Sequence, residues 1–195
     1  MKTFALRSGR PLISFRHGLG LALAGALVLG AAFSGAGCGT MPYEAPPDGV
    51  WDDLGEPGEG LAAALRGGRW GYVKLGGALA VLPQFAEALP FSEGRAAVRL
   101  TERWGYVDRA GKYLVKPRFA EARSYSDGLA AVKTGEGWGY LDLAGEFAVE
   151  PGYDEALPFS EGLAAVRLGS RWGYIRKDGS VAVRFALKAA GRFSG

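Results

Sequence analysis

The stretch Arg103-Trp104-Gly105-Tyr106-Val107-Asp108 decides the fold, because its central triplet returns through the chain at one constant spacing. The triplet Trp-Gly-Tyr occurs every 34 residues, beginning at Trp70, Trp104, Trp138 and Trp172. A fixed period of this length is typical of stacked copies of one small structural unit rather than of an irregular enzyme core. We therefore predict a tandem repeat.

A longer sequence motif recurs with the same period around each tryptophan. Each copy opens with an acidic residue and a glycine, at Glu59-Gly60, Glu93-Gly94, Asp127-Gly128 and Glu161-Gly162. After the triplet come a proline, an aromatic residue and then a Glu-Ala pair, at Glu87-Ala88, Glu121-Ala122 and Glu155-Ala156. The edges of the array are degenerate: Trp51 has the phase of Phe85, and Phe185 and Leu187 replace the proline and the aromatic of the last copy. Atypical terminal copies are expected, since an outermost unit lacks a neighbour.

The pattern inside each unit favours strands over helices. Gly and Pro occupy internal positions that a helical hairpin would not tolerate, and side chains alternate with period two around Trp104 and Tyr106. The segments 108–111 and 142–145 each begin with Asp and end with Gly, which is typical of a hairpin turn. Each unit is thus predicted to be a three-stranded antiparallel meander, with strands in the second copy at about 96–99, 103–108 and 112–116, followed by a connector.

The Trp-Gly pairs are the predicted structural positions of the repeat. We expect the indole rings to lie in the core; an exposed stacking platform for sugars or peptide chains is the alternative. A glycine in a strand marks close backbone approach or a missing side chain that another group replaces, and here we expect an aromatic ring of the adjacent unit to fill the space. The positions are Trp70, Gly71, Trp104, Gly105, Trp138, Gly139, Trp172 and Gly173.

The motif resembles the bacterial WG repeat over about residues 59–193. The resemblance rests on the Trp-Gly-Tyr triplets, the following Gly-Lys and Val-x-Pro-x-Phe, and the closing Glu-Ala-x-Pro-Phe-Ser-Glu-Gly. It implies a repetitive β architecture, with no catalytic residues and no single function. We predict an all-β fold of 34-residue antiparallel meanders, at about 59–92, 93–126, 127–160 and 161–195, stacked as an open, curved, solenoid-like array. A small β-propeller is the alternative.

The N-terminal segment predicts that the protein is exported. Residues 1–37 join a basic start to an apolar run, as a signal peptide does. Small residues precede Cys38, so we expect lipidation of Cys38 and a Pro-rich and acidic tether over residues 38–58. Ordinary signal cleavage and an uncleaved membrane helix remain alternatives. The expected location is the bacterial cell envelope, and Gly39 after the cysteine favours the outer membrane by analogy with known lipoproteins.

The charge balance gives no argument for nucleic-acid binding. The whole chain has a net charge of +3, but its first 37 residues carry four basic and no acidic side chains. The remainder has 19 Lys and Arg against 20 Asp and Glu, a net charge of −1. A basic face for a phosphate backbone is therefore not expected.

The side chains of common catalytic sites are missing from the predicted repeat region. His17 is the only histidine and Cys38 the only cysteine, and both precede the repeats. We therefore expect no enzyme, no cofactor and no metal site. The in-phase carboxylates Glu87, Glu121 and Glu155 are most simply turn or surface residues, with a calcium ladder or a glycosidase pair as alternatives. We expect no asymmetric group of residues to interrupt the repeat.

These observations lead to three hypotheses about function. The first is a non-enzymatic, membrane-anchored envelope lipoprotein whose array binds or scaffolds a protein or glycan. The second is a carbohydrate-active enzyme or lectin that uses the repeated carboxylates and aromatics. The third is a purely structural spacer. The expected partners are the membrane, through the lipid anchor, and an envelope protein or glycan.

Overall fold

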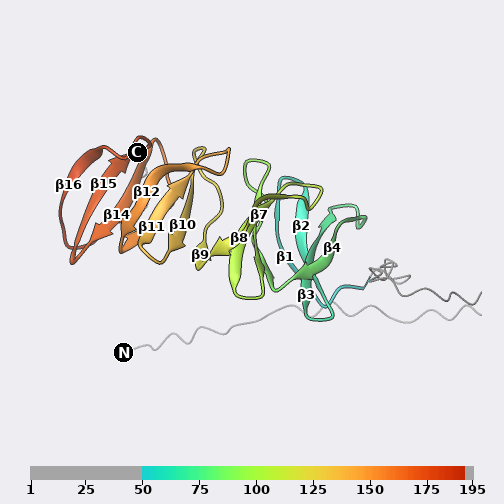
Figure 1. Cartoon of the computed structure of the whole chain (residues 1–195). Coiled ribbons are helices and arrows are strands. Elements are labelled where there is room, and N and C mark those ends of the chain that lie inside the picture. Colours follow the sequence, from blue (N-terminus) through green and yellow to red (C-terminus); the bar gives the residue numbers. More distant parts are fainter. Residues whose placement is uncertain (1–49, 192–195) are drawn as a thin grey trace, which may run out of the picture. The chain divides into compact units, whose positions relative to one another are not determined.

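The computed structural model describes residues 50–191, and every regular element in that range is a β-strand (Figure 1). Sixteen strands form four sheets of four, each a meander whose neighbouring strands are antiparallel and consecutive in the chain. This confirms the all-β prediction of tandem antiparallel repeats. Cys38, the expected signal peptide and most of the expected tether lie outside the described residues. Within the described range no helix has the length and apolar character needed to span a bilayer.

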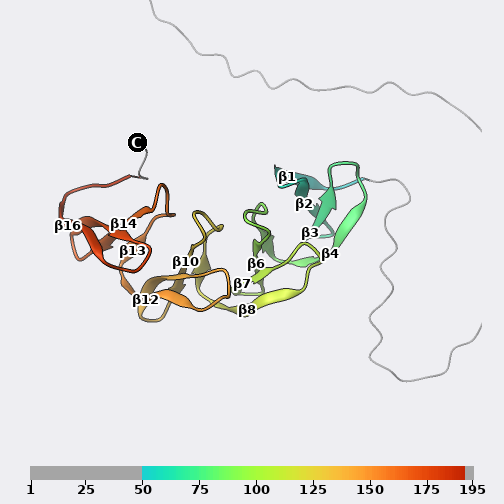
Figure 2. The same cartoon turned by 90° about the horizontal axis from the view of Figure 1, so that it is seen from above.

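The strands follow one another in the same pattern in each sheet, and Figure 2 shows the sheets from above. The first sheet contains β1 (Asp53–Gly58), β2 (Leu61–Arg66), β3 (Arg69–Lys74) and β4 (Leu79–Phe85). The second contains β5 (Glu87–Ala88), β6 (Ala96–Leu100), β7 (Arg103–Val107) and β8 (Tyr113–Phe119). The third contains β9 (Glu121–Ala122), β10 (Ala130–Thr134), β11 (Gly137–Leu141) and β12 (Phe147–Tyr153). The fourth contains β13 (Glu155–Ala156), β14 (Leu163–Leu168), β15 (Arg171–Arg176) and β16 (Val181–Leu187).

The turns predicted from Asp and Gly are present between the last two strands of a sheet. Between β7 and β8, Oδ1 of Asp108 accepts hydrogen bonds from the backbone N–H groups of Ala110 and Lys112, both at 2.9 Å. Gly111 has a φ of +80°, which a glycine adopts without strain. Asp142 makes the same two bonds between β11 and β12.

Each sheet has one strand more than the predicted meander. In the first sheet the extra strand is β1, and in the other three it is the Glu-Ala pair, expected in a connector, which forms a two-residue edge strand. In β5, Glu87 pairs with Arg99 and Ala88 with Val98. At the opposite edge, β8 continues through Pro117 to Phe119. An edge strand tolerates proline because its outward side needs no backbone donor.

The expected tether of residues 38–58 extends too far into the chain. Its last six residues form β1, which pairs with β2. Trp51 has the phase of Phe85 and packs against the buried Ala62, Ala64 and Val73 on the outer face of the first sheet. The degenerate unit inferred from Trp51 therefore serves as a cap for this face, where no preceding sheet is present among residues 50–191.

Each Trp-Gly pair needs its glycine because the backbone of the next strand lies too close to leave room for a Cβ. The expectation that an aromatic ring of the adjacent unit fills this space is therefore wrong. The β7–β8 register has a bulge: Trp104 pairs with Phe119 and Tyr106 with Val115, so the chain of β8 loops across Gly105. A Cβ on Gly105 would lie 2.5 Å from the carbonyl oxygen of Val115 and 2.7 Å from the nitrogen of Pro117. The close approach comes from the same unit rather than from an adjacent one.

The core lies between consecutive sheets. Three clusters of buried residues join the first sheet to the second, the second to the third, and the third to the fourth. Tyr72, Tyr106 and Tyr140 are fully buried in these clusters. No cluster among the described residues joins the first sheet to the fourth, so the array is open. This agrees with the predicted stacking of repeats.

Hydrogen bonds from side chains to backbone groups connect each sheet to the next. The hydroxyl of Tyr106 donates to the carbonyl of Arg123 at 2.7 Å, and Tyr72 and Tyr140 make the equivalent bonds. The acidic residue that opens each of the first three copies accepts a hydrogen bond from the glycine N–H of the following copy, as Glu93 does from Gly128 at 3.0 Å. These contacts explain the acidic-Gly motif as a link between repeats.

The last unit packs less closely than the others, in line with its sequence. Phe185, in place of the repeat proline, stacks on Tyr153 with ring centroids 6.3 Å apart. Val183 is 42 % exposed, whereas its equivalents Val81, Val115 and Val149 are 4–7 % exposed beneath the following sheet.

Candidate functional site

The predicted structural positions lie in the interior of the array. Trp104 and Trp138 are 9 % and 4 % exposed, and Trp70 and Trp172 near its two ends are half-buried. Gly71, Gly105, Gly139 and Gly173 all lie beneath the backbone of the next strand. The Trp-Gly pairs therefore shape the core, and only the two end indoles are partly exposed.

The in-phase carboxylates face cations on the neighbouring strand. Glu87 pairs with Arg99, Glu121 with Lys133 at 2.7 Å, and Glu155 with Arg167 at 3.3 Å. These are cross-strand ion pairs at the sheet edge, and such exposed pairs contribute little to stability. Among residues 50–191 no group of three or more His, Cys, Asp and Glu side chains is placed to hold a metal ion.

The repeat is interrupted at one place that the sequence analysis did not identify. Two copies carry Leu-Pro-Phe before the serine, at residues 89–91 and 157–159, whereas the copy between them carries Arg123-Ser124-Tyr125. Arg95 also departs from its phase, since the equivalent residues are Leu61, Leu129 and Leu163. Comparison of the copies position by position would have identified this group.

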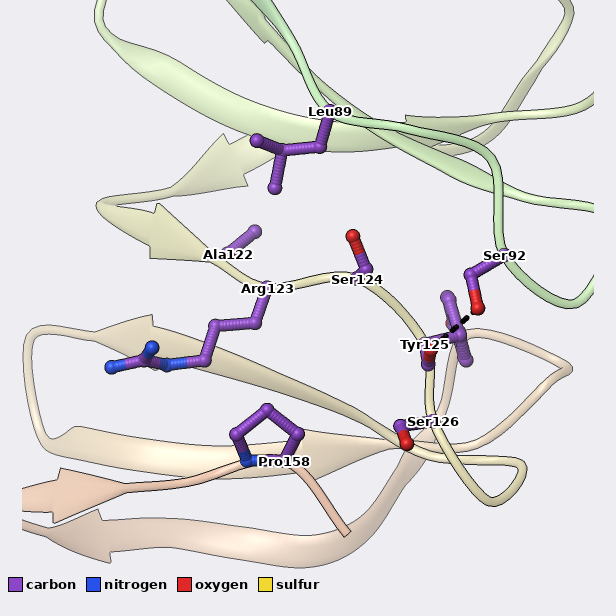
Figure 3. Close-up of a pocket in the computed structure, with 8 residues that line it drawn as sticks. All are labelled: Leu89, Ser92, Ala122, Arg123, Ser124, Tyr125, Ser126 and Pro158. Carbon is purple, nitrogen blue, oxygen red and sulfur yellow. Dashed lines mark hydrogen bonds between the residues drawn. The ribbon is translucent and has the colours of Figure 1, made fainter. Parts of the chain in front are cut away.

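The interruption lies where three connectors pack side by side, the segments 89–95, 123–129 and 157–162 that follow the two-residue strands. The hydroxyl of Ser92 donates to the carbonyl of Tyr125 at 2.8 Å, and the hydroxyl of Ser126 donates to the carbonyl of Phe159 at 2.8 Å. A pocket of about 510 Å³ crosses them (Figure 3). Its lining consists of Leu89, Ser92, Ala122, Arg123, Ser124, Tyr125, Ser126 and Pro158. We call it the connector pocket.

The backbone of Arg123 is hydrogen-bonded on both sides, whereas its guanidinium makes no hydrogen bond or ion pair within residues 50–191. Its N–H donates to the carbonyl of Ala131, and its carbonyl accepts from Tyr106. Its guanidinium carbon lies 5.0 Å from the centre of the Trp138 ring, in a cation–π contact. The guanidinium makes no hydrogen bond or ion pair with any residue in the range 50–191, and its Nε is buried.

Arg95 and Tyr125 form the rigid side of the pocket region. The guanidinium of Arg95 lies 5.4 Å from the centre of the Tyr125 ring and donates to the carbonyls of Glu93 and Leu143. The Tyr125 hydroxyl donates to the carbonyl of Asp142 at 2.9 Å. Burial raises the pKa of the Tyr125 phenol to about 12, although the positive charge of Arg95 opposes this shift. The phenol is therefore neutral at physiological pH.

Two polar side chains of the connector pocket are left to donate hydrogen bonds to a ligand, the guanidinium of Arg123 and the hydroxyl of Ser124. The hydroxyls of Ser92, Ser126 and Tyr125 already donate to backbone carbonyls. The guanidinium gives the pocket a positive charge. Such an arrangement can hold a ligand that carries acceptor oxygens.

Comparison with known proteins establishes the family. The model of the WG containing repeat matches residues 70–103, 104–137 and 138–172, just over half of the chain. The chain therefore belongs to the WG containing repeat family, which confirms the resemblance inferred from its triplets. No curated protein matches the sequence.

Solved structures with detectable similarity are distant. KlHsv2 with loop 6CD replaced by a Gly-Ser linker has a TM-score of 0.46 at 10 % identity, over 66 % of this chain. The extracellular domain of the putative hybrid two component system BT3049 from B. thetaiotaomicron has a TM-score of 0.41 at 17 % identity, over 68 % of this chain. The N-terminal domain of Nup159 has a TM-score of 0.45 at 11 % identity, over 69 % of this chain. The chain spans 49 %, 22 % and 43 % of the lengths of these three proteins, respectively.

Proposed function

We propose that this chain is a non-enzymatic lipoprotein of the bacterial cell envelope, and that its WG-repeat array binds a protein or glycan partner at the connector pocket. The observation that carries the proposal is the coincidence of a pocket with the interruption of the repeat. Arg123 and Ser124 stand where neighbouring copies have Leu and Pro. Since Leu-Pro-Phe already satisfies the packing of two connectors, the polar residues serve something other than packing.

The proposed location rests on the sequence. The basic and apolar start and the small residues before Cys38 support export and lipid anchoring. The mass of the mature N-terminal peptide tests this part of the proposal. A diacylglyceryl-modified peptide beginning at Cys38 is expected, and an unmodified or uncleaved N-terminus would contradict the anchor.

The two alternative functions gain less support from the site. The carboxylates proposed for glycoside chemistry each face a cation. Every aromatic side chain in residues 50–191 is buried or half-buried, so a sugar-stacking platform has no fully exposed ring to use. A pure spacer would give no reason for an uncommitted arginine in a pocket.

Site-specific photo-cross-linking in the native bacterium tests partner binding. A benzoyl-phenylalanine residue replaces Ser124 in the full chain, and the matched control replaces Leu168, which is 42 % exposed at the end of β14. We expect a discrete adduct from position 124 and none from position 168. The absence of an adduct at position 124, or equal adducts at both positions, would contradict a partner site at the connector pocket.

A further inference from the structure

We infer that the connector pocket binds an extended peptide segment through one of its carboxylate groups, with Arg123 as the residue that recognises it. This inference rests on the proposed function and specifies the partner. Figure 3 shows the guanidinium of Arg123 extending from the middle connector on the side of Pro158, with the Ser124 hydroxyl directed toward Leu89. The pocket thus has an apolar residue toward each end, and the side chain of Arg123 starts between them and reaches to one side.

The side chain of Arg123 has a buried N–H donor that lacks a hydrogen-bond acceptor among residues 50–191. The contact with Trp138 places the guanidinium carbon 5.0 Å from the ring centre and supplies no oxygen acceptor for the N–H groups of Arg123. No residue in the described range accepts a hydrogen bond from these groups, and Nε is shielded from solvent. A buried donor without an acceptor is unfavourable, and a carboxylate can satisfy two N–H groups of a guanidinium at once.

The charge of the surroundings favours a carboxylate over a phosphate dianion. Lys133, the other cation near the Trp138 ring at 5.8 Å, is already paired with Glu121. Arg95 already donates to two backbone carbonyls. Arg123 is then the single uncommitted cation of the pocket, and one guanidinium matches the single charge of a carboxylate.

The shape and lining of the pocket favour a peptide over a glycan. The pocket runs across three stacked connectors, from Leu89 to Pro158, so an extended chain can place apolar side chains at both ends and an acidic one between them. Sugar recognition usually adds a ring face for stacking, yet the only aromatic lining residue is Tyr125, which is 2 % exposed. The Ser124 hydroxyl, directed toward Leu89, can bond to peptide backbone.

Titration of the full chain by NMR tests the inference. The probe is the capped pentapeptide acetyl-Ala-Leu-Glu-Leu-Ala-amide, and the comparison probes are the same peptide with Gln for Glu and free glucuronate. The signals followed are the Nε–H of Arg123, assigned by its loss in Arg123→Leu, and the backbone N–H of Ser124, which both variants retain and which reports their binding. Arg184→Leu is the matched control, because it removes the same charge at a phase where the first copy has Leu82.

The expected result is a saturable shift of the Arg123 signal by the Glu peptide. Binding is weaker by at least about tenfold for the Gln peptide or for Arg123→Leu, and changes less than about twofold for Arg184→Leu. A saturable shift by glucuronate alone would overturn the peptide assignment. Equal binding of the Glu and Gln peptides, or no shift by any probe, would overturn the carboxylate. If a cross-link at position 124 persists in the Arg123→Leu chain, this inference fails while the proposed function stands.

Discussion

At the scale of the residue, Gly105 is a position where the repeat leaves no room for a side chain. The bulged strand β8 passes over it, and a Cβ would meet the carbonyl oxygen of Val115 at 2.5 Å. Because both partners are backbone, neither can move aside without breaking the register. We predict that Gly105→Ala lowers the free energy of unfolding by roughly 2–3 kcal/mol, as overpacking does. Gly152→Ala is the control: its Cβ meets nothing within 4 Å, and a change below about 0.5 kcal/mol is expected. Equal losses in urea denaturation would contradict this account.

The connector pocket makes a prediction of the opposite sign. The double variant Arg123→Leu with Ser124→Pro restores the residues of the neighbouring copies. It removes a buried donor without an acceptor and adds a proline where two equivalent positions accept one, so the free energy of unfolding should rise by about 1 kcal/mol. The same variant should lose binding of the Glu peptide. A less stable variant in urea denaturation would mean that the polar residues serve packing instead.

The buried tyrosines predict how stability depends on pH. Burial raises the pKa of Tyr125 to about 12 and also raises the pKa of Tyr106. Over the range from pH 10 to 12 the folded chain therefore holds phenolic protons that the unfolded chain releases, so stability is full below pH 10 and falls above it. Tyrosinate absorbance and circular dichroism should change together above pH 10. Titration of all tyrosines near pH 10 with the fold intact would contradict the prediction.

At the scale of the element, the links between sheets matter as much as the strands. Glu93 reaches from one unit to the N–H of Gly128 in the next. We predict that Glu93→Ala costs about 1–2 kcal/mol, the value of a charge-assisted hydrogen bond, and speeds exchange of the Gly128 amide hydrogen. Glu102→Ala, at an exposed turn, should change stability by less than about 0.5 kcal/mol. An unchanged exchange rate at Gly128 in Glu93→Ala would contradict the link.

The same elements show what sequence could predict. The long strands and the Asp108 turn followed from alternation and turn chemistry, because these are local properties. The two-residue strand at Glu87 carries no periodicity of its own and exists because β6 lies beside it. The role of Gly105 also escaped prediction, since the bulge that covers it depends on the register of two strands. For the site, the departure at Arg123 was visible in the repeat, but the pocket required the stacking of three connectors.

At the scale of the whole molecule, contacts between consecutive sheets predict that one unit can be removed. Deletion of residues 93–126 joins Ser92 to Asp127, and deletion of residues 127–160 joins Ser126 to Glu161, each in register with the 34-residue period. In an array with nearest-neighbour contacts both variants should fold. Their urea m-values should fall by roughly a quarter, because less surface is exposed on unfolding.

The two deletions have different effects on the connector pocket. The first removes Arg123 and Ser124; the second keeps them and brings Trp172 to the phase of Trp138, but it removes Pro158 from one end of the pocket. A binding module therefore predicts loss of the Glu-peptide interaction in the first variant and weakened binding in the second, measured by fluorescence anisotropy of the labelled probe. If the protein is a spacer, neither deletion variant should bind the Glu peptide, and the two variants should support the function of the protein in the cell equally well. Failure of both variants to fold would contradict the nearest-neighbour description of the array itself, since removal of an internal unit would then disturb contacts beyond consecutive sheets.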